Sequence, residues 1–143
     1  MLKEKKKIRV CKIEAEQTWA LRQRVMWPNE PIEYVKLPED PSGIHFGLFV
    51  GKKLVSVVSV FINGNSAQFR KFATETAKQG KGYGSKLLNY LFVAIQRDHF
   101  DRIWCNARVR QVGLYEKFGM CKTDERFTKG GIEFVVMERR LKQ

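Results

Sequence analysis

The sequence contains few of the residues that build disulfide frameworks or metal centres. Its 143 residues include three cysteines and two histidines. Cys11, Cys105 and Cys121 lie far apart, no C-x-x-C pair occurs, and His45 and His99 lack the spacing of metal ligands. We therefore expect no metal and no disulfide framework, and we interpret the cysteines as small buried hydrophobic side chains.

Long apolar segments are also missing. The longest apolar run, LVSVVSVFI at 54–62, has the length of a strand and falls far short of the roughly 20 residues that span a membrane. The N-terminal MLKEKKKIRV is basic but lacks the apolar region and small-residue cleavage site of a signal peptide. These absences predict a cytoplasmic protein with no membrane partner.

Acidic residues are scarce, with 15 against 27 basic ones and a net charge of +12. This excess favours anionic partners, either a nucleic acid or a phosphorylated small molecule. Part of it lies in KEKKK at 3–7 and ERRLK at 138–142, which we interpret as solvated ends. The length and the 43% hydrophobic content fit a single domain covering 1–143.

The spacing of apolar residues predicts a mixed α/β (α+β) fold. Strands are expected at 8–13, 45–50, 54–62, 66–74, 102–107, 120–127 and 132–140, and helices at 14–26, 85–98 and 110–118. The order is β-α-β-β-β-α-β-α-β-β. It indicates a largely antiparallel central sheet flanked by helices.

The first helix and the segment after it have distinct compositions. We expect an apolar helix face formed by Ala15, Trp19, Leu21, Val25 and Met26. All four prolines follow within 28–44, which predicts an ordered loop with at most one helical turn. Loops of this length in compact domains are usually functional or mobile.

The stretch QGKGYGSKLL, residues 79–88, places three alternate glycines between a predicted strand and a predicted helix. The first N–H groups of a helix have no internal partner, and the helix dipole adds positive potential there. The N–H groups from Gly80 to Ser85 are therefore expected to bind an anion such as pyrophosphate, with help from Lys81 and Lys86. A flexible turn requiring positive φ is the alternative interpretation.

Two familiar phosphate loops do not fit this stretch. A Walker A loop requires G-x4-G-K-[ST], but Ser85, Lys86 and Leu87 occupy its last three positions when the count starts at Gly80. A dinucleotide fingerprint requires a third glycine where Ser85 stands, and a parallel unit where the preceding strands look antiparallel.

The spacing Gln79-x-x-Gly82-x-Gly84 resembles the [QR]-x-x-G-x-[GA] signature of the GCN5-related N-acetyltransferases (GNAT family), which bind acetyl-CoA. Three further segments resemble that family's fourth strand, its third helix and its Y-x-K-x-G-F segment, namely FRKFAT at 69–74, SKLLNYLFVAI at 85–95 and LYEKFGM at 114–120. The predicted order of elements also agrees from residue 8 to the end.

The resemblance implies a GNAT-like sheet and acetyl-CoA as the acetyl-donor cosubstrate, with no metal. The glycine loop would hold the pyrophosphate, and the strand before it would offer main-chain groups to the pantetheine arm. The residues implied in this site are Phe72, Ala73, Thr74, Gln79, Gly80, Lys81, Gly82, Tyr83, Gly84, Ser85, Asn106 and Arg108.

The resemblance also implies catalytic roles. Tyr115 matches the tyrosine that protonates the departing thiolate, and an N–H of Ala73 or Thr74 would polarise the thioester carbonyl. The candidates for the base are Glu33, Glu39, Asp40, His45 and Glu75, and no spacing singles one out. We name Glu75 as catalytic beside Tyr115.

Two positions depart from the family pattern. Many members have an asparagine seven residues before the tyrosine, where this chain has Arg108, and the nearest asparagine is Asn106. Met120 replaces the usual phenylalanine after the late glycine, a mild apolar exchange.

The acceptor site is expected along the first helix and 28–44. Its wall is expected to include Trp27, Tyr34, His45 and Phe46, and its acidic residues Glu30, Glu33, Glu39 and Asp40 would suit a cationic amine.

The predicted activity is transfer of an acetyl group from acetyl-CoA to a primary amine of a small molecule or peptide, by direct attack on the thioester. A homodimer is compatible with the sequence. The alternatives are a nucleic-acid-binding module, which has the charge but no recognition signature, and a CoA-binding protein without catalysis.

Overall fold

The computed structural model describes residues 6–141 of the protein, so parts of both terminal charge runs, 3–5 and 142, lie outside the described residues. Its elements are β1 (Ile8–Ile13), α1 (Ala15–Met26), β2 (Ile44–Val50), β3 (Lys53–Asn63), β4 (Ser66–Thr74), α2 (Tyr83–Arg97), β5 (Arg102–Arg108), α3 (Val112–Glu116), β6 (Cys121–Lys129) and β7 (Ile132–Arg140). Short 3-10 turns occur at η1 (Ile32–Val35), η2 (Asp40–Ser42), η3 (Thr76–Lys78) and η4 (Val109–Gln111). The predicted order of strands and helices is confirmed.

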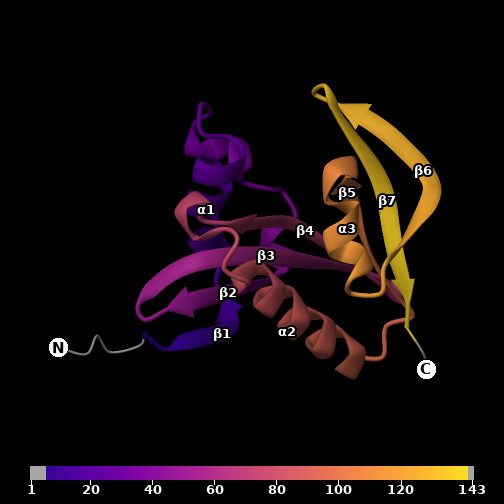
Figure 1. Ribbon diagram of the computed structural model, residues 1–143, viewed down its shortest axis with the longest axis horizontal. Helices are drawn as coiled ribbons and strands as arrows, with labels where there is room; N and C mark the ends of the chain where they lie inside the picture. Colours follow the sequence, from indigo (N-terminus) through magenta and orange to yellow (C-terminus); the bar gives the residue numbers. More distant parts are fainter. Residues whose placement is uncertain (1–5, 142–143) are drawn as a thin grey trace. The chain divides into compact units, whose positions relative to one another are not determined.

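The strands form one sheet in the order β1-β2-β3-β4-β5-β7-β6 (Figure 1). The pairs β1–β2, β2–β3, β5–β7 and β6–β7 are antiparallel, whereas β4 and β5 pair in parallel through Ser66–Gln68 and Arg102–Trp104. The mixed α/β, largely antiparallel sheet expected from the sequence is therefore confirmed.

The chain divides into two compact units. The first unit comprises the chain up to Val60 together with Lys71–Phe92, and the second comprises Phe61–Arg70 together with the chain from Val93 onward. A single domain over 1–143 stays a prediction. Each unit is described below by itself.

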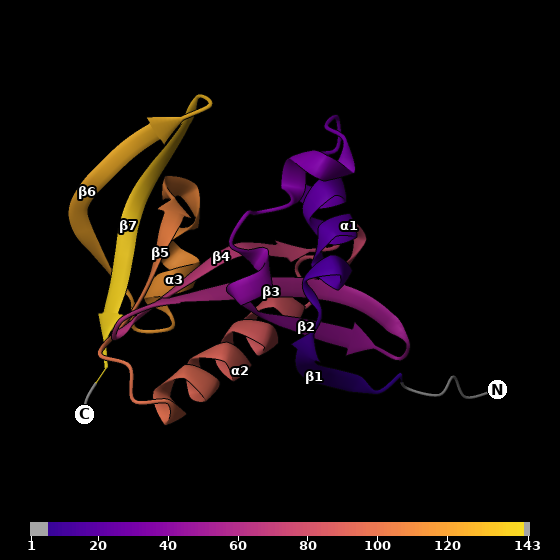
Figure 2. The same ribbon diagram turned by 180° about the vertical axis from the view of Figure 1, so that it is seen from behind.

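In the first unit, α1 and α2 cover opposite faces of the sheet (Figures 1 and 2). Leu21 of α1 packs with Val57 of β3 and Ala73 of β4. On the other face, the ring of Phe46 in β2 meets the ring of Tyr90 in α2 with centroids 5.8 Å apart. The two faces follow from the alternation of side chains along a strand.

The face that α1 buries differs from the expected one. The helix begins after Glu14, whose N–H donates to Gln17 Oε1 at 2.8 Å. Its buried residues are Thr18, Leu21 and Arg22, while Trp19 is only partly buried. Leu21, Val25 and Met26 of the expected face do pack in the core, but the buried face also includes Arg22, which the sequence reading did not place there.

In the second unit, β5 presents Ile103, Cys105 and Ala107 to the core and Asn106 to solvent. The buried hydrophobic residues from other elements of this unit are Ala67, Phe69, Ile95, Tyr115, Met120, Val135, Val136 and Met137. All three cysteines are free thiols; Cys105 is buried, but Cys121 is exposed. The expectation of buried cysteines is thus wrong for Cys121.

Within residues 6–141, no helix is long and apolar enough to cross a membrane. The same residues contain no group of three or more histidine, cysteine or acidic side chains arranged to hold a metal ion.

Candidate functional site

The glycine loop joins the end of β4 to the start of α2. Gly80 and Gly82 have φ angles of +78° and +84°, a left-handed conformation that a residue with a Cβ adopts only with strain. A Cβ built on either glycine would meet no other atom within 4 Å. The loop therefore leaves open space at both glycines, as close approach of a phosphate requires.

The third glycine is packed against the end of β4. A Cβ on Gly84 would lie 2.8 Å from Phe72 Cζ and 3.2 Å from Thr74 Oγ1. Gly84 lies in the first turn of α2, so the missing side chain lets this turn pack directly on the end of β4. Gly84 therefore packs closely on β4, while Gly80 and Gly82 leave open space, and the binding of pyrophosphate by the N–H groups of 80–85 stays a prediction.

Hydrogen bonds fix the end of β4 beneath the loop. Ser56 Oγ of β3 lies 2.8 Å from Thr74 Oγ1 and 3.3 Å from the Ala73 carbonyl oxygen. Gln79 Nε2 donates to the Thr74 carbonyl oxygen at 3.0 Å. The side-chain amide of Gln79 thus joins the loop to the strand, and its expected place at the edge of a pyrophosphate stays a prediction.

The charged and hydroxyl groups of the loop face solvent. Lys81, Ser85 and Lys86 are exposed, and Tyr83 is partly buried. α2 has 15 residues, so its first N–H groups add the field of a full helix dipole to the two ammonium groups. The arrangement suits a multivalent anion.

Glu75 follows β4 directly and forms an ion pair with α1. Its Oε2 lies 2.6 Å from Arg24 Nη2, and its backbone N–H donates to the Val55 carbonyl oxygen at 2.8 Å. The hydrogen bond from Arg24 lowers the pKa of the Glu75 carboxyl from its ordinary value of 4.5, against a smaller opposing effect of burial. Glu75 is therefore ionised and oriented, but it is a weaker base than a free carboxylate.

Tyr115 belongs to the second unit, in α3. It is 6% exposed, and its ring packs on Phe69 with centroids 5.6 Å apart. Gly119, at φ +81°, ends this segment, as the sequence predicts. Burial and the neighbouring Cys105 raise the pKa of the Tyr115 hydroxyl well above 10, outweighing the opposite effect of Arg108. The hydroxyl therefore keeps its proton at every physiological pH.

The two other expected contacts of the second unit lie on β5. Asn106 pairs with Val136 of β7 and is exposed, and Arg108 pairs with Phe134 and is partly buried. Because side chains alternate along a strand, Asn106 and Arg108 share the face opposite to Cys105. Both candidate replacements for the family asparagine therefore lie on one face of β5.

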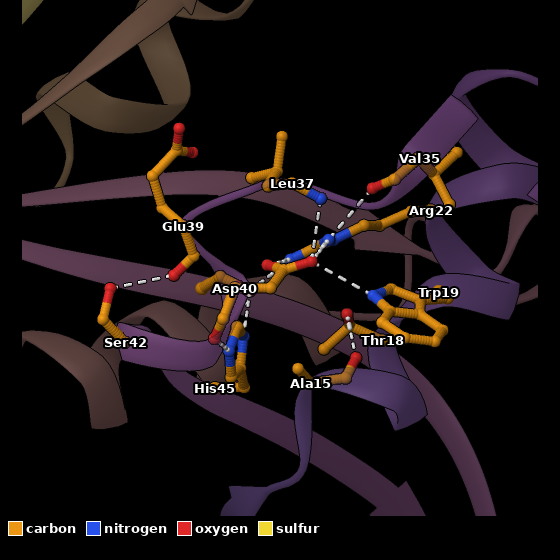
Figure 3. Close-up of polar contacts among 11 residues, drawn as sticks. Ala15, Thr18, Trp19, Arg22, Val35, Leu37, Glu39, Asp40, Ser42 and His45 are labelled. Carbon is orange, nitrogen blue, oxygen red and sulfur yellow. Dashed lines mark hydrogen bonds and ion pairs between the residues drawn. The ribbon is translucent and has the colours of Figure 1, made fainter. Parts of the chain in front are cut away.

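The loop 28–44 is held by a buried ion pair that joins it to α1 (Figure 3). Arg22 is fully buried and binds Asp40 through two hydrogen bonds of 2.8 and 2.9 Å. Its remaining Nη hydrogens reach the Val35 carbonyl oxygen and Ser59 Oγ, at 3.0 and 2.9 Å. Trp19 Nε1 and the Leu37 N–H also donate to Asp40 Oδ2. The loop is thus fixed at both of its 3-10 turns.

His45 completes this cluster through hydrogen bonds at both ring nitrogens. Its Nε2 lies 3.0 Å from the Asp40 carbonyl oxygen, which can only accept, so Nε2 carries the hydrogen. Its Nδ1 lies 2.7 Å from Ser59 Oγ. Both ring nitrogens are therefore engaged inside the protein.

These contacts correct the expected acceptor site. His45 and Phe46 are buried, so they cannot form part of an exposed wall, and Asp40 is 3% exposed and neutralised by Arg22. Asp40 and His45 are therefore not available as bases. Trp27 and Tyr34 do meet, with ring centroids 5.0 Å apart, and Tyr34 is 52% exposed.

Sequence reasoning missed four residues whose hydrogen bonds hold 28–44 and the end of β4 in place, namely Arg22, Arg24, Ser56 and Ser59. The serines had a signal, since LVSVVSVFI places both of them in an otherwise apolar strand that is buried in the structure. The sequence signal for Arg22 was weaker: positions 18, 21, 22 and 25 have the spacing of one helix face, so Arg22 shares the face of Leu21 and Val25.

The comparisons with known proteins agree with this geometry. Residues 25–141 match the family model of the acetyltransferase (GNAT) domain. The chain is 28% identical over 145 residues to the uncharacterized N-acetyltransferase YitI of Bacillus subtilis, covering 94% of this chain and 97% of that protein.

Solved structures share the fold. A protein from Lactobacillus plantarum solved as an N-acetyltransferase superposes with a TM-score of 0.83 at 17% identity, over 94% of this chain and 98% of that one. A GNAT acetyltransferase from Elizabethkingia anophelis, solved with acetyl-CoA bound, gives 0.74 at 15% identity over 94% and 98%. With its glycine loop, its strand order and the match over 25–141, the chain belongs to the GNAT family of acetyltransferases.

Proposed function

We propose that the protein is an acetyl-CoA-dependent N-acetyltransferase that transfers the acetyl group to a primary amine by direct attack on the thioester. The observation that carries the proposal is the loop from Gln79 to Ser85, with two open left-handed glycines at the start of a 15-residue helix. Family membership and the acetyl-CoA bound by the Elizabethkingia protein support the same donor.

On the donor side, the main chain from Gly80 to Ser85 would bind the pyrophosphate, with Lys81 adding charge. Phe72, Ala73 and Thr74 would offer main-chain groups to the pantetheine arm. Gln79 donates to the Thr74 carbonyl oxygen, which has a second lone pair that can accept from the pantetheine arm. Asn106 and Arg108 are the candidates for contacts from β5.

The proposed chemistry assigns one proton transfer to each catalytic residue. The amine nitrogen bonds to the carbonyl carbon and gives a proton to Glu75, directly or through water. The C–S bond then breaks, and the leaving thiolate takes a proton from Tyr115. An N–H of Ala73 or Thr74 would stabilise the negative charge that develops on the carbonyl oxygen.

The environment of each residue limits its contribution. Arg24 keeps Glu75 ionised and ready to accept a proton, but lowers its basicity. Burial keeps Tyr115 protonated, but makes it a weak acid. We therefore expect each to contribute near the lower end of the roughly 10²–10⁴-fold range of general acid–base catalysis.

The acceptor is proposed to be a small-molecule or peptide amine that contacts 28–44 through Trp27 and Tyr34. Lys36 Nζ lies 2.7 Å from Glu33 Oε1, and Arg22 neutralises Asp40, so this region is less acidic than its sequence indicates. A preference for cationic amines therefore rests on Glu30, which is exposed. A cytoplasmic location, suited to three free thiols, and a homodimer stay part of the proposal.

The test combines donor binding with turnover. Calorimetric titration with acetyl-CoA should show binding, and a panel of primary amines should release free CoA thiol. Tyr115→Phe and Glu75→Gln should each lower kcat by about a hundredfold while leaving the affinity for acetyl-CoA unchanged. Glu138→Gln is the matched control, because it also removes an arginine-paired carboxylate but lies on β7, outside the proposed site. Absence of acetyl-CoA binding would refute the donor assignment. Binding without turnover of any amine would favour the non-catalytic alternative.

A further inference from the structure

Ser56 of β3 is a buried polar residue to which the proposed chemistry gives no role. It is fully buried, in a strand whose residues from Val55 to Val60 are otherwise apolar apart from Ser59. Burying a hydroxyl is costly unless it is hydrogen-bonded, so its partners indicate what it stabilises. Ser59 Oγ accepts from Arg22, whereas the hydrogen bonds of Ser56 Oγ within residues 6–141 all go to the end of β4.

One assignment of hydrogens satisfies both contacts of the Ser56 hydroxyl. Ser56 Oγ lies 3.3 Å from the Ala73 carbonyl oxygen and 2.8 Å from Thr74 Oγ1. A carbonyl oxygen can only accept, so Ser56 donates its single hydrogen there, and the Thr74 hydroxyl donates to Ser56. The side chain of Ser56 therefore holds one end of the peptide group between Ala73 and Thr74.

The other end of this peptide group is the N–H of Thr74. Because a peptide group is planar and trans, its C=O and its N–H point in opposite directions. The Ala73 carbonyl points to β3, where Ser56 lies, so the Thr74 N–H points to the opposite edge of β4. The next N–H, that of Glu75, donates to Val55 on β3, as expected when main-chain groups alternate between the two edges of a strand.

The edge of β4 to which the Thr74 N–H points is not paired with a strand at this position. Among the described residues, β4 pairs with β5 only through Ser66–Gln68, so the ladder ends well before Thr74. The Thr74 carbonyl, on the same edge, accepts from Gln79 Nε2 at 3.0 Å, which also fixes the following peptide group. Both peptide groups of Thr74 are therefore held in place without a ligand, and groups placed in advance lose less entropy on binding.

We propose that Ser56 is a positioning residue for the acetyl donor, since it orients the Ala73–Thr74 peptide so that the Thr74 N–H meets an amide carbonyl of the pantetheine arm. The inference rests on the proposed function, because it takes acetyl-CoA as the ligand of β4. It goes further by adding a residue of β3 and by selecting the N–H of Thr74 over that of Ala73. The hydrogen bond at the Ala73 carbonyl also polarises the peptide group and strengthens the Thr74 N–H as a donor.

The test compares two ligands that differ in the arm. Calorimetry on the full-length protein measures the affinities for acetyl-CoA and for the adenosine bisphosphate that is left when CoA loses its phosphopantetheine arm. Ser56→Ala should weaken the binding of acetyl-CoA about fivefold, the value of one neutral hydrogen bond, since the Thr74 N–H is no longer held in place. The affinity for adenosine bisphosphate should be unchanged, because the glycine loop would bind its phosphates.

Thr18→Val is the matched control. Thr18 is as buried as Ser56, and its hydroxyl also donates to a main-chain carbonyl, that of Ala15 in α1, at 2.7 Å. This variant should lose comparable stability in urea and keep both affinities. Equal weakening of both ligands by Ser56→Ala would overturn the inference, because it indicates a structural role. An unchanged affinity for acetyl-CoA, or the same weakening in Thr18→Val, would also overturn it.

Hydrogen exchange in the wild-type protein, followed by NMR, is a second measurement that needs no variant. Saturation with acetyl-CoA should slow the exchange of the Thr74 amide several-fold, whereas saturation with adenosine bisphosphate should not. Protection at Ala73 but not at Thr74 would contradict the orientation of the peptide group. Absence of acetyl-CoA binding by the wild type would refute the proposed function, and this inference with it, before any variant is compared.

Discussion

Helix α1 contributes two arginines to two ion pairs whose surroundings differ. Arg22 and Asp40 are 0% and 3% exposed, and their closest nitrogen and oxygen lie 2.8 Å apart. Arg24 and Glu75 are 50% and 18% exposed, and theirs lie 2.6 Å apart. Arg22 and Arg24 are two positions apart, which places their side chains about 200° apart around the helix axis. One arginine therefore points into the protein, while the other reaches its surface.

The distances do not distinguish the two pairs, but burial does. A buried charge deprived of its partner stays buried and uncompensated, whereas an exposed one regains water. The first pair is therefore expected to matter for the fold of 28–44, and the second for the chemistry at the end of β4.

The largest expected effect is on the buried pair. Asp40→Ala leaves the Arg22 guanidinium without its carboxylate and should lower the free energy of unfolding by about 3–5 kcal/mol. Urea denaturation measures this loss. The double variant Arg22→Met/Asp40→Leu removes both charges and should recover a large part of it. A double variant as unstable as Asp40→Ala would mean that shape, not charge, governs this position.

An intermediate effect is expected in acid. Burial raises the pKa of Asp40, but the hydrogen bonds from Arg22, Leu37 and Trp19 outweigh it and lower the pKa from 3.8 to about 2. Since the folded-state pKa is below the unfolded one, the contribution is fully present above pH 3.8 and is lost as the pH falls through 2. It amounts to about 2 kcal/mol.

Urea denaturation at a series of pH values can isolate this contribution. The difference in stability between the wild type and Arg22→Met/Asp40→Leu should shift by that amount between about pH 5 and pH 2. A difference that stays constant over this range would contradict the assignment.

The smallest expected effect is on the exposed pair. Arg24→Met should change the free energy of unfolding by at most about 1 kcal/mol, because solvent screens the charges. It should instead raise the pKa of Glu75 and so move the acidic limb of the pH–rate profile to higher pH. Arg9→Met, on the β1 strand, is the control for loss of an exposed arginine. A profile that does not move would separate Glu75 from the proton transfer.

The same comparison explains what the sequence could predict. The strands at 8–13, 66–74 and 132–140 were predicted at their observed bounds, because alternating side chains and flanking turns mark both ends. The glycine loop and Gly119, which ends the α3 segment, were predicted because these positions need a positive φ, which glycine adopts more readily than any other residue.

Pairings between distant residues could not be predicted. Helical periodicity treats an arginine as outward-facing, so it gave no reason to bury Arg22, and its partner Asp40 lies 18 residues away in a proline-rich loop. The acidic residues of 28–44 were interpreted from local composition, which cannot register that Arg22 neutralises Asp40. Long-range partners are decided by packing, and a single sequence does not record it.

The close approach of Gly84 to Phe72 has a consequence for the history of the chain. The family signature allows glycine or alanine where Gly84 stands, yet an alanine methyl here would lie 2.8 Å from the Phe72 ring. We therefore expect the two positions to vary together: relatives with alanine in the helix should carry a smaller residue in the strand. The family signature allows alanine at position 84, but in this protein an alanine there would fit only if the residue at position 72, twelve positions earlier, were smaller than phenylalanine.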